Sequence, residues 1–190
     1  MAVAFRGIVK LTEFHIKGPK LIEPKVHGDA RGFFTERYRE DLFREFGVQT
    51  HFVQDNYSRS QVKVLRGLHF QYDQPQAKLI TAAAGTILDV IVDIRVSSPT
   101  FGQSLSVELD GKRPAWFFVP AGFAHGFLVL SSEGADLMYK VDSYYNPAGE
   151  SGVRWNDPTL GINWPIHDPI VSPRDAEMQG WDSYRKSPRF

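Results

Sequence analysis

TILDVIVDIR, residues 86–95, carries the clearest strand pattern in the chain. Its even positions from 88 to 94 read Leu, Val, Val and Ile, whereas its odd positions from 87 to 95 read Ile, Asp, Ile, Asp and Arg. Successive side chains of a strand point to opposite faces, so one face of this segment is wholly apolar and the other carries charge. The segment therefore predicts a β-strand with one core face and one mixed face.

Similar short segments fill most of the chain, separated by scattered glycines and prolines. The other expected strands are 20–23, 32–37, 51–57, 64–72, 79–83, 103–109, 115–119, 126–130 and 135–144. The 14 Phe, 7 Tyr and 4 Trp favour the same class, because aromatic side chains fit a pleated surface. Many short strands at close spacing are typical of an antiparallel sandwich or barrel, so we expect an all-β fold.

The 190 residues indicate a single domain, 1–190. We expect residues 1–30 to form an N-terminal arm with one or two strands, which could complete a neighbour's sheet. Residues 31–146 would form the core, including a helix at 39–46 that ends at Gly47. Residues 147–190 are rich in Trp, Pro, Asp and Gly, and we expect a loop-rich tail with a short helix within 172–180.

The composition argues against several kinds of binding partner and reactive site. Lys plus Arg and Asp plus Glu are 22 each, so no overall charge favours nucleic acid or an anionic membrane. The absence of cysteine excludes disulfides, thiolate metal sites and cysteine nucleophiles, and it fits the cytoplasm. Residues 1–11 lack the apolar core of a signal peptide, and Asp89 and Asp93 interrupt the most apolar run. We therefore expect a cytoplasmic protein that neither spans nor binds a membrane.

Two histidines are candidates for chemistry. His69 shares a strand face with Gln71, opposite Leu68 and Phe70, and such a polar pair can line the interior of a barrel. His125 follows the turn at 120–122, and a Pro-x-Gly turn before a histidine resembles one half of the cupin metal site.

The other half of a cupin metal site, a His-x-His pair with a following Glu, is missing. His69-Phe70-Gln71 stands in its place and supplies a single imidazole. Two histidines without a third ligand make a poor divalent site. We therefore expect a cupin-like barrel that holds no metal.

Seven motifs occur in order along most of the chain. They are DARGFFTE at 29–36, QDNYS at 54–58, VLRGLHFQ at 64–71, DIR at 93–95 with SPTFG at 98–102, VPAGFAHGF at 119–127, MYKV at 138–141 and WNDP at 155–158. Together they resemble the dTDP-4-dehydrorhamnose 3,5-epimerase family. The resemblance implies an antiparallel jelly-roll barrel with a few short helices.

The resemblance also implies a cofactor-independent reaction. Its substrate would be a dTDP-linked 4-keto-6-deoxy sugar, with dTDP-4-dehydro-6-deoxy-D-glucose converted to dTDP-4-dehydro-L-rhamnose. Inversion beside a ketone needs a base on one face of the sugar, a proton donor on the other, and a group that stabilises the enolate oxygen. The acid–base part of this scheme can be matched to particular residues.

By similarity His69 is the base, Asp175 its hydrogen-bonding partner and Tyr139 the acid, while Lys78 and Arg66 stabilise the oxygen. An imidazole, with an ordinary pKa of about 6.5, can accept a proton at neutral pH, and a phenol, at about 10, keeps its own. Strand alternation puts Arg66 and His69 on opposite faces. Both reach one site only if the chain bends at Gly67, which glycine permits.

Further positions are implied to hold the substrate. Four positions match residues that contact the diphosphate, ribose or base in the family: Arg31, Glu36, Gln54 and Asn56. Tyr144 matches an aromatic residue that packs on the base. His125 and Arg174 are the remaining substrate-binding positions. The segment 31–36 reaches a neighbouring subunit's site in the family, which implies a homodimer with arm exchange. We expect Asp89 to brace His125.

Two positions depart from the family pattern. His27 replaces an aromatic residue that helps to sandwich the base, and Arg174 stands where lysine is common, with a planar guanidinium in place of an ammonium. Residues 180–190 match nothing in the pattern.

Other functions stay open at this stage. An epimerase that acts on one carbon, or a ketoisomerase on the same barrel, would use a similar base and acid. A sugar-binding jelly roll without catalysis and a metal-dependent cupin oxygenase are alternatives from other classes. The sequence alone hardly distinguishes an epimerase that inverts both carbons beside the ketone, a double epimerase, from one that inverts a single carbon.

Overall fold

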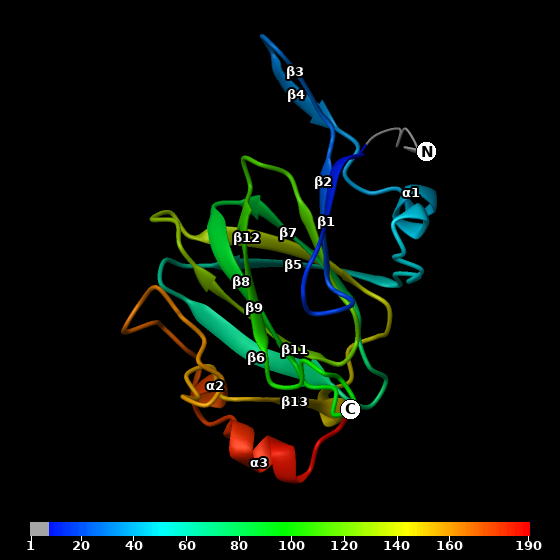
Figure 1. The fold of residues 1–190 in the computed structure, drawn as a ribbon. Helices are drawn as coiled ribbons and strands as arrows, with labels where there is room; N and C mark the ends of the chain where they lie inside the picture. The colour runs from blue at the N-terminus through cyan, green and yellow to red at the C-terminus, as the bar shows by residue number, and fades with distance from the viewer. Residues whose placement is uncertain (1–7) are drawn as a thin grey trace.

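The structure is a computed structural model that describes residues 8–190. In this part of the chain two antiparallel sheets face each other as a barrel (Figure 1). The first sheet has the order β1 (Ile8–Glu13), β2 (Lys20–Pro24), β10 (Trp116–Val119), β7 (Lys78–Ala84), β12 (Ala135–Val141) and β5 (Gln54–Ser60). The second has the order β13 (Glu150–Gly152), β6 (Leu65–Gln71), β11 (Phe123–Val129), β8 (Thr86–Asp93) and β9 (Ser104–Asp110). The predicted all-β, jelly-roll class is confirmed.

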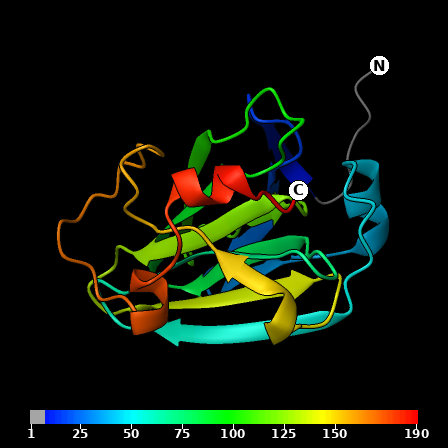
Figure 2. The ribbon, with the colours of Figure 1, turned by 90° about the horizontal axis from the view of Figure 1, so that it is seen from below.

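Strand β8 is buried on both faces. Ile87 and Ile91 point between the sheets, into a core cluster that includes Phe117 from the opposite sheet. The wholly apolar face, residues 88–94, packs instead on the outside of the barrel, where the C-terminal helix α3 (Trp181–Lys186) covers it (Figure 2). The mixed face of the sequence pattern is therefore the interior one, and it carries Asp89 into the barrel.

The short helices differ in how well the sequence predicts them. α1 (Glu40–Glu45) buries Leu42 and Phe43 and is followed by Gly47 at φ 77°, as expected. α2 (Pro173–Ala176) lies within the predicted range 172–180. The 3-10 helix η1 (Pro147–Gly149) and β13 were not predicted, because three residues are too few to show a period in the sequence. α3 was not predicted either, because only Trp181 and Tyr184 of its residues are buried and two positions do not define a helical face.

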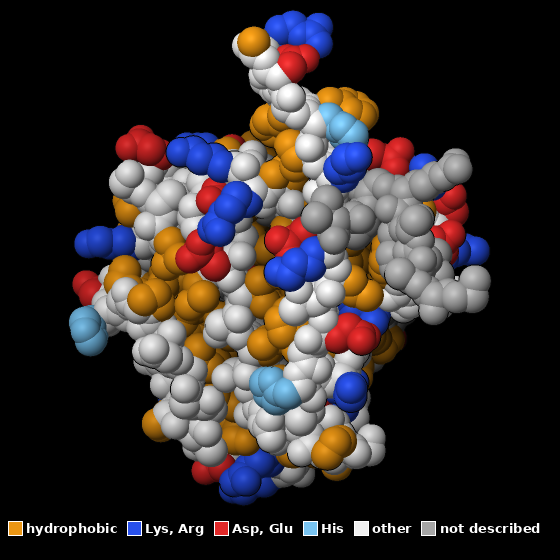
Figure 3. Space-filling view, turned by 45° about the horizontal axis from the view of Figure 1, so that its top comes forward, with side chains coloured by type: hydrophobic (Ala, Val, Ile, Leu, Met, Phe, Trp, Pro, Cys, Tyr) orange, Lys and Arg blue, Asp and Glu red, His pale blue; other side chains and the backbone are white. Residues whose placement is uncertain are grey.

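The N-terminal region divides differently from the expected arm. β1 and β2 belong to the barrel's own six-stranded sheet, where β2 pairs with β10. The part that projects is the hairpin of β3 (Val26–Asp29) and β4 (Gly32–Thr35), which stands clear of the body in Figures 1 and 3. The expected boundary at residue 30 falls in the turn of this hairpin. Exchange of the hairpin between subunits stays a prediction.

Within residues 8–190, no helix is long and apolar enough to cross a membrane.

The motif DIR with SPTFG builds a buried hydrogen-bond network. Asp93 has no exposed surface and accepts hydrogen bonds from the Arg95 guanidinium at 2.8 Å and from the hydroxyls of Ser98 and Thr100 at 2.6 Å. Burial alone raises the pKa of Asp93, but these hydrogen bonds outweigh it and hold the pKa below its ordinary value. The motif therefore stabilises the loop after β8.

Asp93→Asn is expected to lower the free energy of unfolding by about 3 kcal/mol at pH 7, because it leaves the Arg95 cation without its buried partner. A carboxylate with a depressed pKa stabilises the fold above its unfolded pKa and loses that contribution as the pH falls. The difference between variant and parent should therefore shrink below about pH 4. Urea unfolding over pH 3–7 measures both effects. Asp182→Asn, in an exposed ion pair with Arg185, is the control; equal losses in the two variants would contradict this account.

Candidate active site

The space between the sheets narrows into a cavity of about 400 Å³. Predicted site residues that line it are Gln54, Asn56, Arg66, His69, Lys78, His125 and Tyr139. Pockets that bind small molecules commonly fall in this size range. The cavity is therefore large enough for a sugar, and polar side chains from six strands surround it.

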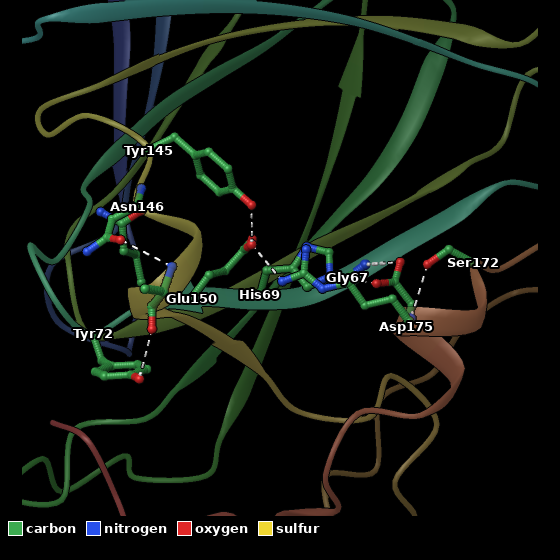
Figure 4. Close-up of polar contacts among 11 residues, drawn as sticks. Gly67, His69, Tyr72, Tyr145, Asn146, Glu150, Ser172 and Asp175 are labelled. Atoms are coloured by element: carbon green, nitrogen blue, oxygen red, sulfur yellow. Dashed lines mark hydrogen bonds and ion pairs between the residues drawn. The ribbon is translucent and has the colours of Figure 1, made fainter.

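His69, on β6, is paired with Asp175, which comes from α2 (Figure 4). The His69 Nε2 to Asp175 Oδ1 distance is 2.6 Å, and the other carboxylate oxygen accepts the Gly67 N–H at 3.2 Å. Burial alone raises the pKa of Asp175, but the hydrogen bond from His69 and the other donors lower it further than burial raises it. An ionised carboxylate only accepts, so Nε2 carries the proton and Nδ1 is the nitrogen left to act as a base.

Arg66 and His69 line the same cavity, although alternation separates them. Three residue steps on β6, from Arg66 to His69, lie opposite two steps on β11, from Phe127 to His125. This β-bulge reverses the alternation, and Gly67 at φ 115° sits inside it. The bend at Gly67 that the sequence requires is present.

Tyr139 lies on β12, in the sheet opposite His69, and its side chain is half-buried. Burial raises the pKa of Tyr139, which Arg66 partly offsets, so the phenol stays protonated at neutral pH. Among residues 8–190, no group hydrogen-bonds its hydroxyl. The proton of Tyr139 is thus available to a ligand in the cavity.

Lys78 and His125 are the other predicted site residues in the cavity whose side chains can ionise. Burial lowers the pKa of Lys78, and the carboxylates of Glu150 and Asp89 oppose this. Asp89, which has no exposed surface, lies 2.9 Å from Nε2 of His125, so the expected brace is present. Burial also lowers the pKa of His125, despite Asp89. The cavity therefore holds a lysine beside two imidazoles, each with its own carboxylate.

Four predicted substrate-binding residues lie outside this cavity. Arg31 is at the tip of the projecting hairpin, paired with Asp29 at 2.6 Å, and Glu36 is close to Arg39. Tyr144 is 67% exposed. Arg174 lines an adjoining groove and bonds Glu150 at 2.6 Å. A single chain therefore does not bring these four residues into the cavity.

The structure adds Glu150 and Tyr145 to the cavity lining. Glu150 comes from the predicted loop-rich tail, 147–190, where β13 places it opposite Gln71 on β6, and Tyr145 comes from the end of the predicted core, just after the strand expected at 135–144. A lone carboxylate and a second tyrosine in a loop give no periodic signal. Among residues 8–190, no group of three or more His, Cys, Asp or Glu side chains is arranged to hold a metal ion.

The profile of a known family, dTDP-4-dehydrorhamnose 3,5-epimerase, matches residues 13–183. The chain belongs to the dTDP-4-dehydrorhamnose 3,5-epimerase family. Among its curated relatives, the epimerase of Salmonella typhimurium is 48% identical over 159 residues, 82% of this chain and 86% of the relative. That of Methanothermobacter thermautotrophicus is 44% identical over 178 residues, 92% and 94% of the two chains.

A solved structure of this epimerase family has the same fold. The dTDP-6-deoxy-D-glucose-3,5-epimerase of Legionella pneumophila Philadelphia 1, in complex with dTDP-4-keto-L-rhamnose, superposes with a TM-score of 0.87 at 46% identity. The match covers 91% of this chain and 93% of that one. The family resemblance of the seven motifs is confirmed, and the chain is an isomerase of the epimerase class.

Gly67→Ala is expected to destabilise this epimerase by about 3 kcal/mol, because backbone and packing both oppose a side chain there. Its Cβ would lie 2.5 Å from the Gly126 Cα, and φ is 115°. Gly161→Ala is the control, since φ is 58° there and nothing lies within 4 Å, so about 1 kcal/mol is expected. Urea unfolding measures the free energy of unfolding of both variants. Equal decreases in the two would contradict the expected destabilisation by the close contact between Gly67 and β11.

Proposed function

We propose that this chain inverts C3 and C5 of dTDP-4-dehydro-6-deoxy-D-glucose and so forms dTDP-4-dehydro-L-rhamnose without a cofactor. The observation that carries the proposal is the placement of base and acid. His69, backed by Asp175, comes from one sheet, and Tyr139 comes from the facing sheet, with the cavity between them. A sugar ring in that cavity presents one face to each.

Proton transfer follows from this placement. Nδ1 of His69 takes the proton from a carbon next to the C4 ketone, and the C–H electron pair moves to the ketone oxygen as an enolate. Lys78 and Arg66, both in the cavity lining, stabilise the negative oxygen. Tyr139 then donates its proton to the opposite face of the carbon, which inverts it. Exchange with solvent restores both groups before the second carbon reacts.

The nucleotide part of the proposal needs two chains. Gln54 and Asn56 lie in the cavity, while Tyr144 and Arg174 lie outside it and would contact the nucleotide. Arg31 and Glu36 would enter from a partner's hairpin, giving a homodimer with arm exchange. Phe33 and Phe34 support this, because they are 61% and 69% exposed in one chain and an exposed aromatic pair favours a protein contact. The ligand in the Legionella structure supports dTDP as the carrier.

The reaction can be tested by incubating the enzyme with dTDP-4-keto-6-deoxyglucose in heavy water. Mass spectrometry and NMR then locate deuterium in the product. The double epimerase predicts uptake at both C3 and C5. Uptake at one carbon would instead show a single-carbon epimerase, and uptake at neither would refute both.

His69→Ala and Tyr139→Phe are expected to affect different steps. The first should abolish deuterium exchange, because no base remains. The second should permit exchange while slowing inversion by at least about 100-fold, because the acid is lost but the base is intact. Rates of washout and inversion, measured separately, check this.

Tyr57→Phe, at an exposed position on β5, is the matched control and should leave both rates unchanged. Complete loss of exchange in both active-site variants would contradict the division of roles.

A further inference from the structure

The loop 142–146 joins β12 to η1 and carries Tyr144 and Tyr145. Tyr145 lines the cavity and is 53% exposed, so it lies at the opening of the cavity, and the exposed Tyr144 is next to it. In Figure 4 the ring of Tyr145 points toward Glu150, another residue of the cavity lining. The loop lies outside both sheets, so its backbone groups need partners other than a neighbouring strand.

The side-chain amides of three glutamines, Gln54, Gln71 and Gln76, supply such partners. Gln76 donates to the carbonyl of Ser143 at 2.7 Å. Gln54 accepts the N–H of Tyr145 at 3.4 Å. Gln54 and Gln76 also line the cavity, where a ligand can touch them, whereas Gln71 is 5% exposed and lies outside the lining. An effect of Gln71 on the loop can therefore be separated from direct contact with a ligand.

Gln71 binds the loop on both sides of Tyr145. Its Oε1 accepts the N–H of Asn146 at 2.8 Å, and its Nε2 donates to the carbonyls of Tyr144 at 3.1 Å and Gln74 at 2.6 Å. These partners fix the orientation of the amide, because only its oxygen can accept and only its nitrogen can donate. The side chain therefore serves the loop as a peptide group of an adjacent strand would.

The sequence pairs Gln71 with His69 on one face of β6, but the structure gives the two side chains different surroundings. His69 lines the cavity, whereas Gln71, the last residue of β6, lies against the loop. A buried amide with all of these hydrogen bonds is costly to replace, because its main-chain partners would be left unpaired. Gln71 therefore links the strand that carries the predicted base to the loop at the cavity opening.

We propose that Gln71 is a positioning residue for nucleotide binding, whose amide orders the loop 142–146 and so holds Tyr144 and Tyr145 at the cavity opening. The inference rests on the proposed function, in which the nucleotide binds at this opening. A flat base can stack on a tyrosine ring. A loop that is ordered beforehand loses less conformational entropy when the ligand binds, so the amide strengthens binding. Its effect falls on affinity and not on proton transfer.

The test compares Gln71→Glu with the parent enzyme. A carboxylate oxygen would replace Nε2 and face the carbonyls of Tyr144 and Gln74, which repel it. The KM for dTDP-4-keto-6-deoxyglucose and the Kd for dTDP, measured by calorimetry, should rise at least about tenfold, while kcat stays within about threefold. Gln71→Met, which is neutral and of similar size, should act in the same direction. Unfolding of both variants, seen by circular dichroism, would overturn the proposal by making Gln71 a residue of the core.

Gln49→Glu is the matched control, because the exposed Gln49 also donates its amide to a main-chain carbonyl, that of Arg44, at 2.8 Å. Its KM, Kd and kcat should equal those of the parent. A KM and Kd for Gln71→Glu within about twofold of the parent would overturn the proposal, as would a loss in kcat alone.

A second comparison tests whether Gln71 acts through the two tyrosines. In a protein that carries Tyr144→Ala and Tyr145→Ala, Gln71→Glu should cause no further loss of dTDP affinity, because the rings that it positions are gone. Additive losses would show that Gln71 acts by another route and would overturn the proposal.

Hydrogen–deuterium exchange of the resting protein gives a measurement that does not depend on turnover. In Gln71→Met the N–H of Asn146 loses its acceptor, so exchange in the loop should be at least about tenfold faster, whereas exchange in β8 should be unchanged. Unchanged exchange in the loop would contradict the proposal. Faster exchange with weaker dTDP binding, in a protein whose parent has no epimerase activity, would support it while refuting the proposed function.

Discussion

Polar groups inside an apolar barrel must be paired, and the pairing of imidazole with carboxylate shapes this structure. Asp175 holds His69 at 2.6 Å and Asp89 holds His125 at 2.9 Å, and both carboxylates are almost fully buried. A buried carboxylate without a partner would be costly, as would an unpaired imidazolium. Each pair satisfies its two members and leaves the other ring nitrogen free for a ligand. The barrel can therefore keep reactive groups in its interior.

The two sheets of the jelly roll place the polar groups on opposite sides of the cavity. Because His69 belongs to the five-stranded sheet and Tyr139 to the six-stranded sheet, the two side chains approach the cavity from opposite walls. The bulge at Gly67 adds Arg66 to the wall that carries His69. Asp175 is brought in from the tail, more than one hundred residues later. The tail thus supplies the hydrogen-bond partner of His69 and, through α3, packs on the outside of the barrel.

Much of this could be predicted from the sequence. Strand alternation predicted most of the individual strands, and the pattern around His69 predicted the interior face of β6, because both are local properties of the sequence. The bulge was accessible in part, since a glycine between two residues of opposite face indicates where a strand can bend. The pairing of His69 with Asp175 came only from the family resemblance, because spacing along the chain does not encode it.

Other features could not be predicted, for physical reasons. Burial of both faces of β8 depends on α3. Trp181 and Tyr184 of this helix pack on β8, and two apolar residues do not identify a helix in the sequence. The position of Glu150 depends on a three-residue strand that forms only by pairing with β6. The division of the N-terminal region depends on β2 pairing with β10, a contact between distant segments. In each case the position of the segment is determined by a contact with residues far away in the sequence.

The central claim is that one sugar ring lies between His69 and Tyr139. A crystal structure with a dTDP-linked 6-deoxyhexose that has a hydroxyl in place of the C4 ketone tests it directly. The account predicts that His69 Nδ1 and the Tyr139 hydroxyl approach C3 or C5 from opposite faces, each at about 3.5 Å. A ring with both groups on the same face, or bound outside the cavity, would contradict it.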